Sequence, residues 1–332
     1  MARDRRSVGH FLRSSLTALA ILSATTGLTK TAQALEWPTQ PIRLIVGFIP
    51  GTSPDIIGRI VADKLGPRLG QRIVVESVPA GGGTVANAMV AKAPPNSHML
   101  LMLTASHPGT VATRKSLPYD PVNDFAMVTK VVAYPMVLLT KPNSPIKSFD
   151  DLIVRAKAGP GTLSWGTNTV GSIHYLLAQL ISNEAGISIV SVPYPGSPPS
   201  ILDLLGGRID AMFDTATSSF ARIHEGELRA LALSAPTRYR LAPDIPTMNE
   251  TLPGVEAMSW LGFAMAPGTS PAIIDLVNSE TRAVLAMPEI ETQFSRLGVM
   301  PDPSSPDEMR NQIEQEIALW TRTVEQQQIE KR

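Results

Sequence analysis

The chain repeatedly changes from one hydrophobic period to another. Short β-branched runs lead through turns rich in Gly, Pro, Ser or Thr into segments with apolar residues three and four positions apart. Strands are predicted at residues 42–48, 73–75, 99–103, 131–140, 162–165, 187–192, 209–213, 228–233 and 260–265. Helices are predicted at residues 54–65, 85–93, 172–184, 198–205 and from about 306, and a loop at residues 214–219. This alternation indicates an α/β fold with helices covering a largely parallel sheet.

The first of these turns has features of an anion site. Ser53 is a good N-cap, Pro54 fits the first helical position, and Asp55 suits the positive helix end. Backbone amides near Gly51 and Thr52 are therefore predicted to face outward, where they attract carboxylates or phosphates. A single turn of this kind is weak evidence, because many strand-to-helix turns share it.

Similar turns recur along the chain, and their recurrence adds weight. They lie at residues 81–84, 166–172 and 195–197. In an open parallel sheet such turns gather at the carboxyl ends of the strands, where ligands bind. The sequence therefore predicts a small-molecule site built from several turns.

The first 34 residues have the pattern of an export signal. Four arginines precede an apolar stretch at residues 14–28, and Ala32-Gln33-Ala34 supplies small residues for cleavage after about Ala34. The apolar stretch is shorter than the roughly 20 residues that cross a bilayer. We therefore predict a periplasmic protein; Arg5-Arg6 leaves the twin-arginine route open beside the general secretory one.

Composition excludes several classes of partner and site. The 332 residues suggest about two domains, and the chain has no cysteine, which excludes disulfides and thiolate chemistry. Residues 1–34 contain five of the 29 basic and one of the 29 acidic residues, so the remainder carries 24 against 28 and a net charge of −4. No basic run of five or more survives in it, and no nucleic-acid partner is expected.

The sequence offers little support for a cofactor, a metal or catalysis. Residues 81–86 match a dinucleotide fingerprint, but no acid that could hold a ribose occurs at residues 77–119. The histidines outside the predicted signal lack metal-site spacing. Ser106, His174 and Asp214 could be drawn as a hydrolase triad, yet no G-x-S-x-G elbow marks a nucleophile. We expect no cofactor, no metal and no enzymatic activity.

Asp214 has two interpretations. As a capping or solvated loop residue it needs no ligand. If it lines a cleft, its charge would repel a carboxylate but pair with an ammonium or accept a hydrogen bond from a hydroxyl group or water. In the second case it would orient the ligand.

Several segments together resemble one known family. They are "WPTQPIRLIVGFIPGTSPDIIGRIVADKL", "GQRIVVESVPAGGGTVANAMVAKAPPNSHMLL", "LPYDPVNDFAMVT", "VPYPGSPPSILDLLGGRIDAMF", "GELRALAL" and "LAPDIPTMNE". In this order and spacing they resemble the tripartite tricarboxylate transporter receptors, also called the Bug family of periplasmic solute-binding proteins. The resemblance covers essentially all of the chain after the predicted signal.

The resemblance implies a type II periplasmic binding protein with two α/β lobes that close on a ligand. Lobe 1 would comprise residues 35–138 and 261–332 and lobe 2 residues 139–260, with hinge strands at 133–140 and 260–267. Such a receptor is expected to be a monomer that binds a di- or tricarboxylate, an acidic amino acid or an aromatic acid and delivers it to membrane permease subunits. A sensing role with a signalling partner and, less favoured, a periplasmic hydrolase stay open.

The resemblance also implies a set of ligand-binding residues. These are Phe48, Ile49, Pro50, Gly51, Asp55, Thr104, Ser106, Thr167, Asn168, Thr169, Gly171, Ser172, His174 and Asp214. The sequence departs from the family pattern in two places. Ile49 and Thr52 stand where proline and glycine are usual, and Asn168-Thr169-Val170 stands where glycine is commoner. Pocket volume and ligand are therefore expected to differ from the carboxylate norm.

Overall fold

The computed structural model describes Met1, residues 36–326 and residues 328–331. The chain divides into two units, Met1–Glu36 and Trp37–Arg332, and the fold below is that of the second. Apart from Met1, the predicted export signal lies outside the described residues and stays a prediction. Among the helices that the structure describes, none is long and apolar enough to cross a membrane.

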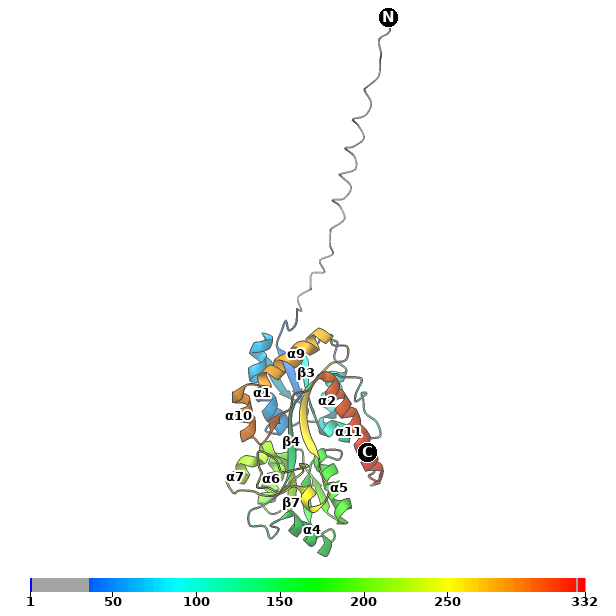
Figure 1. The fold of residues 1–332 in the computed structure, drawn as a ribbon. Coiled ribbons are helices and arrows are strands. Elements are labelled where there is room, and N and C mark those ends of the chain that lie inside the picture. The colour runs from blue at the N-terminus through cyan, green and yellow to red at the C-terminus, as the bar shows by residue number, and fades with distance from the viewer. Residues whose placement is uncertain (2–35, 327, 332) are drawn as a thin grey trace. The chain divides into compact units, whose positions relative to one another are not determined.

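Ten strands among the described residues join into one sheet (Figure 1). They are β1 Ile42–Val46, β2 Ile73–Ser77, β3 Met99–Thr104, β4 Ala126–Thr140, β5 Ser164–Thr167, β6 Val190–Pro193, β7 Ala211–Thr215, β8 Arg229–Leu233, β9 Met258–Met265 and β10 Met300–Pro301. Their order is β2-β1-β3-β9-β4-β7-β5-β6, with β8 and β10 also paired to β4. As predicted, β1 runs parallel to β2 and β3, and β5 runs parallel to β6 and β7. The prediction of a largely parallel sheet is wrong at its centre, where β9 and β4 pair antiparallel with their neighbours because both connect the two ends of the sheet.

The long strand β4 belongs to two halves of this sheet. Residues 126–135 pair with β9, whereas residues 136–140 pair with β7 and β8. We call the part with β1–β3, β9 and β10 the first half, and the part with β5–β8 the second half. The chain enters the second half along β4 and returns through β9, where Met258 pairs with Pro135. The crossovers expected at residues 133–140 and 260–267 fall mainly on these two strands.

The helices are α1 Ser53–Leu69, α2 Thr84–Ala91, α3 Ser106–Thr113, α4 Phe149–Ala158, α5 Ile173–Ala185, α6 Ser197–Leu205, α7 Ala216–His224, α8 Met248–Thr251, α9 Pro271–Leu285, α10 Pro288–Arg296 and α11 Pro306–Gln326, with a short 3-10 turn η1 at Gly81–Gly83. The predicted loop at residues 214–219 is wrong. Asp214 and Thr215 end β7, and α7 begins at Ala216, because burial of Ala216 and Phe220 gives this Ser/Thr-rich segment a helical apolar face.

Buried helix faces hold the layers together. In α1, Ile57, Val61 and Leu65 are fully buried, and they pack with β1 side chains such as Leu44 in one core cluster. Helices α9 and α10 contribute to the same cluster, whereas α2 and α11 pack on the opposite face of the sheet (Figure 1). Helices on both faces leave the carboxyl ends of the strands as the place where turns from several strands meet.

Candidate ligand-binding site

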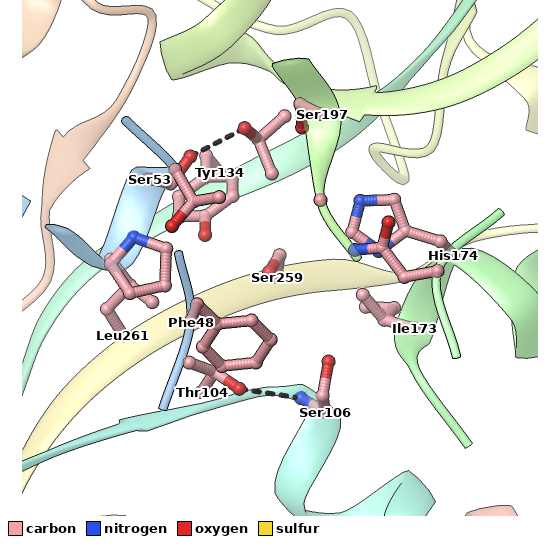
Figure 2. Close-up of a pocket in the computed structure, with 15 residues that line it drawn as sticks. Phe48, Ser53, Thr104, Ser106, Tyr134, Ile173, His174, Ser197, Ser259 and Leu261 are labelled. Atoms are coloured by element: carbon pink, nitrogen blue, oxygen red, sulfur yellow. Dashed lines mark hydrogen bonds between the residues drawn. The ribbon is translucent and has the colours of Figure 1, made fainter. Parts of the chain in front are cut away.

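The pocket that holds most of the predicted turns lies between the two halves of the sheet. It encloses about 440 Å³ of empty space, part of it open to solvent. Its lining residues are Phe48, Thr52, Ser53, Pro54, Thr104, Ser106, Tyr134, Asn168, Ile173, His174, Gly196, Ser197, Thr215, Ser259 and Leu261. In Figure 2, Ser106, Thr104 and Phe48 of the first half face Ile173 and His174 of the second.

Five helices begin at this pocket. Its wall includes the first residues of α1, α3, α5 and α6 and the residue before α7, which are Ser53, Ser106, Ile173, Ser197 and Thr215. Each helix N-terminus carries free amide hydrogens and the equivalent of about half a positive charge. Their convergence gives the pocket a positive field without a cation.

The pocket wall carries many hydroxyl groups and no charged side chain. Eight of the fifteen lining residues carry a hydroxyl group, and none of the fifteen is Asp, Glu, Lys or Arg. Phe48, Pro54, Ile173 and Leu261 supply apolar wall. A wall of this kind can hydrogen-bond a small anion and also contact its carbon skeleton.

His174 presents an unused donor to this wall. Its side chain is buried, and Asn168 Nδ2 lies 3.3 Å from its Nδ1. Because the amide nitrogen can only donate, Nδ1 of the neutral ring accepts and Nε2 carries the hydrogen. Nε2 has no partner among the described residues, and burial lowers the pKa of His174 to about 4. The ring is therefore a neutral donor at physiological pH.

Asp214 lies behind the pocket wall and not in it. It is fully buried at the end of β7, where its Oδ1 accepts hydrogen bonds from the Ser197 hydroxyl group and from the Thr215 amide, the latter at 2.7 Å. Burial raises the pKa of Asp214 to about 7, although both hydrogen bonds act in the opposite direction. The interpretation of Asp214 as a solvated loop residue is wrong, because the strand places its side chain inside the second half.

The chain is similar to proteins of one known family. Residues 57–329 match the family described as "Tripartite tricarboxylate transporter family receptor". The protein BugT of Bordetella pertussis is 34% identical over 312 residues, which cover 93% of this chain and 96% of BugT. The chain belongs to this receptor family. Receptors of the family are periplasmic, and the relatives are solute-binding receptors rather than enzymes.

Solved structures agree with this assignment. MatC of Rhodopseudomonas palustris, solved with bound malate, has a TM-score of 0.81 and 26% identity, covering 86% of this chain and 99% of MatC. Rpa4515 of R. palustris, solved with adipate, has a TM-score of 0.83 and 30% identity, covering 88% of this chain and 98% of Rpa4515. The expected α/β periplasmic binding protein fold is confirmed.

The structure brings part of the predicted set together. Phe48, Thr104, Ser106, Asn168 and His174 line the pocket of the receptor. Phe48 and Asn168 also line a neighbouring cavity, together with two further predicted residues, Ile49 and Thr169. Neither cavity is lined by Pro50, Gly51, Asp55, Thr167, Gly171, Ser172 or Asp214.

Two predictions about the first turn need correction. The Gly51 amide is not free, because it donates to Asp55 Oδ2 at 3.0 Å. The other oxygen of Asp55 is 2.8 Å from Arg59, so both oxygens of this buried carboxylate bind groups at the start of α1 and not a ligand. Thr52, and not Ser53, occupies the N-cap position. The Ser53 hydroxyl group is thereby free to reach across to Thr215, 2.5 Å away.

The halves also touch through two glycines, one in helix α3 and one in the turn before α5. A Cβ atom added at Gly109 in α3 would lie 2.3 Å from the carbonyl oxygen of Gly171, which precedes α5. Gly171 has φ +90°, a conformation that favours glycine, and an added Cβ there would lie 2.3 Å from Thr113 Oγ1. Ser172 caps α5 by accepting from the Tyr175 amide. Gly171 and Ser172 therefore shape the turn from outside the pocket.

The lining residues missed by sequence analysis fall into two groups. A local signal exists for seven of them, which lie in turns, at a helix start or in a loop that the sequence predicts: Thr52, Ser53, Pro54, Ile173, Gly196, Ser197 and Thr215. Tyr134, Ser259 and Leu261 lie on β4 and β9, and Ser259 is the β9 residue opposite Tyr134. No local pattern marks these three, since they reach the pocket only through strand pairing.

The hypothetical hydrolase triad is not assembled. Ser106 and His174 share the pocket, but His174 Nδ1 faces Asn168 and the Asp214 carboxylate serves Ser197 and Thr215. A triad needs the carboxylate on the far nitrogen of the histidine ring. Within the described residues, no group of three His, Cys, Asp or Glu side chains could hold a metal ion.

Proposed function

We propose that this receptor captures a small organic carboxylate in the pocket between the halves of the sheet and delivers it to the permease of a tripartite transporter. The convergence of five helix N-termini on a hydroxyl-rich, uncharged wall carries this proposal. Two structural relatives were solved with malate and adipate, which are carboxylates.

The unpartnered hydrogen on His174 Nε2 supports an oxygen ligand. A buried donor without a partner costs free energy comparable to a lost hydrogen bond. A carboxylate oxygen in the pocket would accept this hydrogen, while helix amides and hydroxyl groups share its second oxygen directly or through water. Phe48, Thr104, Ser106, Asn168 and His174 are the predicted residues assigned to contact the ligand. Gly171 and Ser172 position the start of α5, which carries His174. Asp55 holds the first turn through Gly51, and Asp214 holds the lining residues Ser197 and Thr215.

The halves of the sheet act, in this proposal, as two lobes comprising residues 35–138 with 261–332 and residues 139–260. Opening would separate Ser53 from Thr215 and Gly109 from Gly171 and admit the ligand. Closing excludes water from the carboxylate and strengthens each hydrogen bond to it. We further propose that the chain is exported through cleavage after about Ala34 and works as a monomer in the periplasm.

A thermal-shift screen followed by calorimetric titration tests the carboxylate proposal. A carboxylate at 100 times its dissociation constant should stabilise the receptor by about 2.7 kcal/mol, whereas the matching neutral amide should give no shift. In Gly109→Ala the added Cβ would obstruct closure at Gly171, and we expect weaker binding without loss of folding. Gly58→Ala, another helical glycine whose added Cβ would meet only side-chain atoms, is the matched control. Equal shifts with acids and amides would refute the proposal.

A further inference from the structure

A second cavity adjoins the ligand pocket. Phe48 and Asn168 line both, so these two residues form a stretch of wall that the cavities share. The second cavity, which we call the outer chamber, encloses about 550 Å³ of empty space, part of it open. Its eleven lining residues come from the turns after β1, β2, β5 and β6, and therefore from both halves of the sheet.

The outer chamber differs from the pocket in chemistry. Ile49, Pro79, Ala80 and Pro195 give it aliphatic surface, and Phe48 gives it an aromatic ring. None of its eleven lining residues is Asp, Glu, Lys or Arg. It also lacks the row of serine hydroxyl groups that lines the pocket.

Two polar groups at or near the outer chamber, the Tyr194 hydroxyl group and the Arg114 guanidinium group, have partners outside it. The Tyr194 hydroxyl group donates to Asp203 Oδ2 at 2.7 Å, which leaves the ring as the part of Tyr194 that can contact a ligand. Arg114 lies near the Gly81 turn, but its guanidinium donates to the Gly81 carbonyl oxygen at 3.2 Å and is not among the lining residues. A second anionic group would therefore find no cation in this wall.

The turn at η1 lies close to the turn after β5 on the wall of the outer chamber. An added Cβ at Gly82 would lie 2.8 Å from Thr169 Oγ1, so the backbone of Gly82 lies close to the side chain of Thr169. Ala80, just before this turn, has an extended backbone with φ −138° and ψ 144°, which any L-residue can adopt. A larger side chain at Ala80 can thus be introduced without backbone strain.

We propose that the ligand is an organic acid with an apolar tail, whose carboxylate lies in the pocket and whose tail passes Phe48 and Asn168 into the outer chamber. The inference rests on the proposed function for the carboxylate end and adds the chemistry of the other end. A flexible aliphatic or aryl-alkyl tail suits the chamber, and a second carboxylate at the tail end does not.

A homologous series measures the tail directly. Calorimetric titrations with butanoate, hexanoate, octanoate and 4-phenylbutanoate should show affinity rising by up to about fourfold for each methylene group that enters the chamber. Hexanoate and adipate have the same chain length, and adipate carries a second carboxylate. We expect hexanoate to bind at least tenfold more tightly than adipate, because the second charge would lose its water without gaining a charged partner in the chamber wall.

Two variants locate the tail. Ala80→Trp places an indole at the chamber wall, and we expect the ratio of octanoate to butanoate affinity to fall toward one. Val85→Trp adds the same side chain at an exposed position on α2, outside both cavities, and should keep the wild-type ratio. Circular dichroism melts of both variants check folding, and the ratio within one variant is independent of its active fraction.

The apolar tail and the carboxylate capture can fail separately. A flat series, tighter binding of adipate than of hexanoate, or an unchanged ratio in Ala80→Trp would overturn the apolar tail while leaving carboxylate capture intact. Binding of octanamide as tight as that of octanoate would support the chamber and refute the carboxylate proposal. Failure of every acid to bind would remove both.

Discussion

Two histidines at matching places in the two halves of the sheet show how a binding side chain differs from a structural one. His107 is the second residue of α3, the helix that follows β3, and His174 is the second residue of α5, the helix that follows β5. Both are buried, with exposed fractions of 3% and 6%, and burial lowers the pKa of each to about 4. Each ring has an asparagine amide at Nδ1, Asn87 at 3.1 Å and Asn168 at 3.3 Å.

The two rings differ at Nε2. His107 Nε2 donates to the Pro121 carbonyl oxygen at 2.9 Å, and Tyr119 and Phe125 pack against the ring. His174 Nε2 has no partner among the described residues and its ring lines the pocket. Burial and a lowered pKa are common to both, so neither marks a site. The unpartnered donor does, and we infer that a ligand oxygen takes at His174 the place that Pro121 has at His107.

The largest effect is expected from His107→Ala. The variant leaves a cavity beside Tyr119 and removes the partners of Asn87 and Pro121, so the free energy of unfolding should fall by about 3 kcal/mol. Urea denaturation measures this loss. Carboxylate affinity, titrated at a temperature where the variant is folded, should stay within about twofold of wild type.

The exposed His224 is the matched control for this variant. His224→Ala should change the free energy of unfolding by less than about 0.5 kcal/mol. If His107→Ala were as mild as His224→Ala, or if it abolished binding in folded protein, the distinction between the two buried histidines would be lost.

His174→Ala should show the reverse pattern. It removes one hydrogen bond to a charged ligand, and we expect the dissociation constant to rise about tenfold or more, which corresponds to roughly 1.5 kcal/mol. The free energy of unfolding should fall by less than in His107→Ala, because Nε2 has no protein partner to leave unpaired. Titration and urea denaturation of the same preparation give both numbers.

His174→Gln sharpens the test because glutamine keeps an N–H donor of similar reach. We expect it to recover part of the affinity that alanine loses. Equal losses in the two variants would show that the ring shape, and not the Nε2 hydrogen, matters at this position.

The same comparison shows what sequence analysis can reach. Alternating strand and helix periods predicted most elements and the turns at the carboxyl ends of the strands, and they singled out His174 because it follows a polar turn. They did not predict α3, which places His107. They also read residues 214–219 as a loop, because Ser and Thr favour turns when considered locally and tertiary burial decided otherwise.

Local patterns also could not tell which amides are free. Gly51 has an amide at the predicted place, but the Asp55 side chain four residues later takes it. The positions of Tyr134 and Ser259 depend on pairing between β4 and β9, whose sequences lie more than a hundred residues apart. Residues that act through long-range pairing carry no signal in the period of their own segment.

The smallest expected effect is a change of carboxylate affinity with pH, caused by the carboxyl group of Asp214 behind the pocket wall. Asp214 has a pKa raised to about 7, so it is mostly neutral at pH 6 and ionised at pH 8.5. Its charge would lie directly behind Ser197 and Thr215, both of which line the pocket, and would disfavour a bound anion. Carboxylate affinity should therefore fall from pH 6 to pH 8.5, by roughly threefold if the ligand raises this pKa by half a unit.

Both buried histidines stay neutral over this pH range, since their pKa values are about 4, so they cannot produce the decline. Asp214→Asn removes the ionising group and should give an affinity that no longer changes between pH 6 and pH 8.5. Asp63→Asn, at an exposed site on α1, should keep the wild-type decline. Calorimetric titrations at pH 6, 7 and 8.5 compare the three proteins. A wild-type affinity that rises with pH would mean that a charged Asp214 favours the ligand, and the pocket would then suit a group with a positive charge or a hydrogen-bond donor at Ser197.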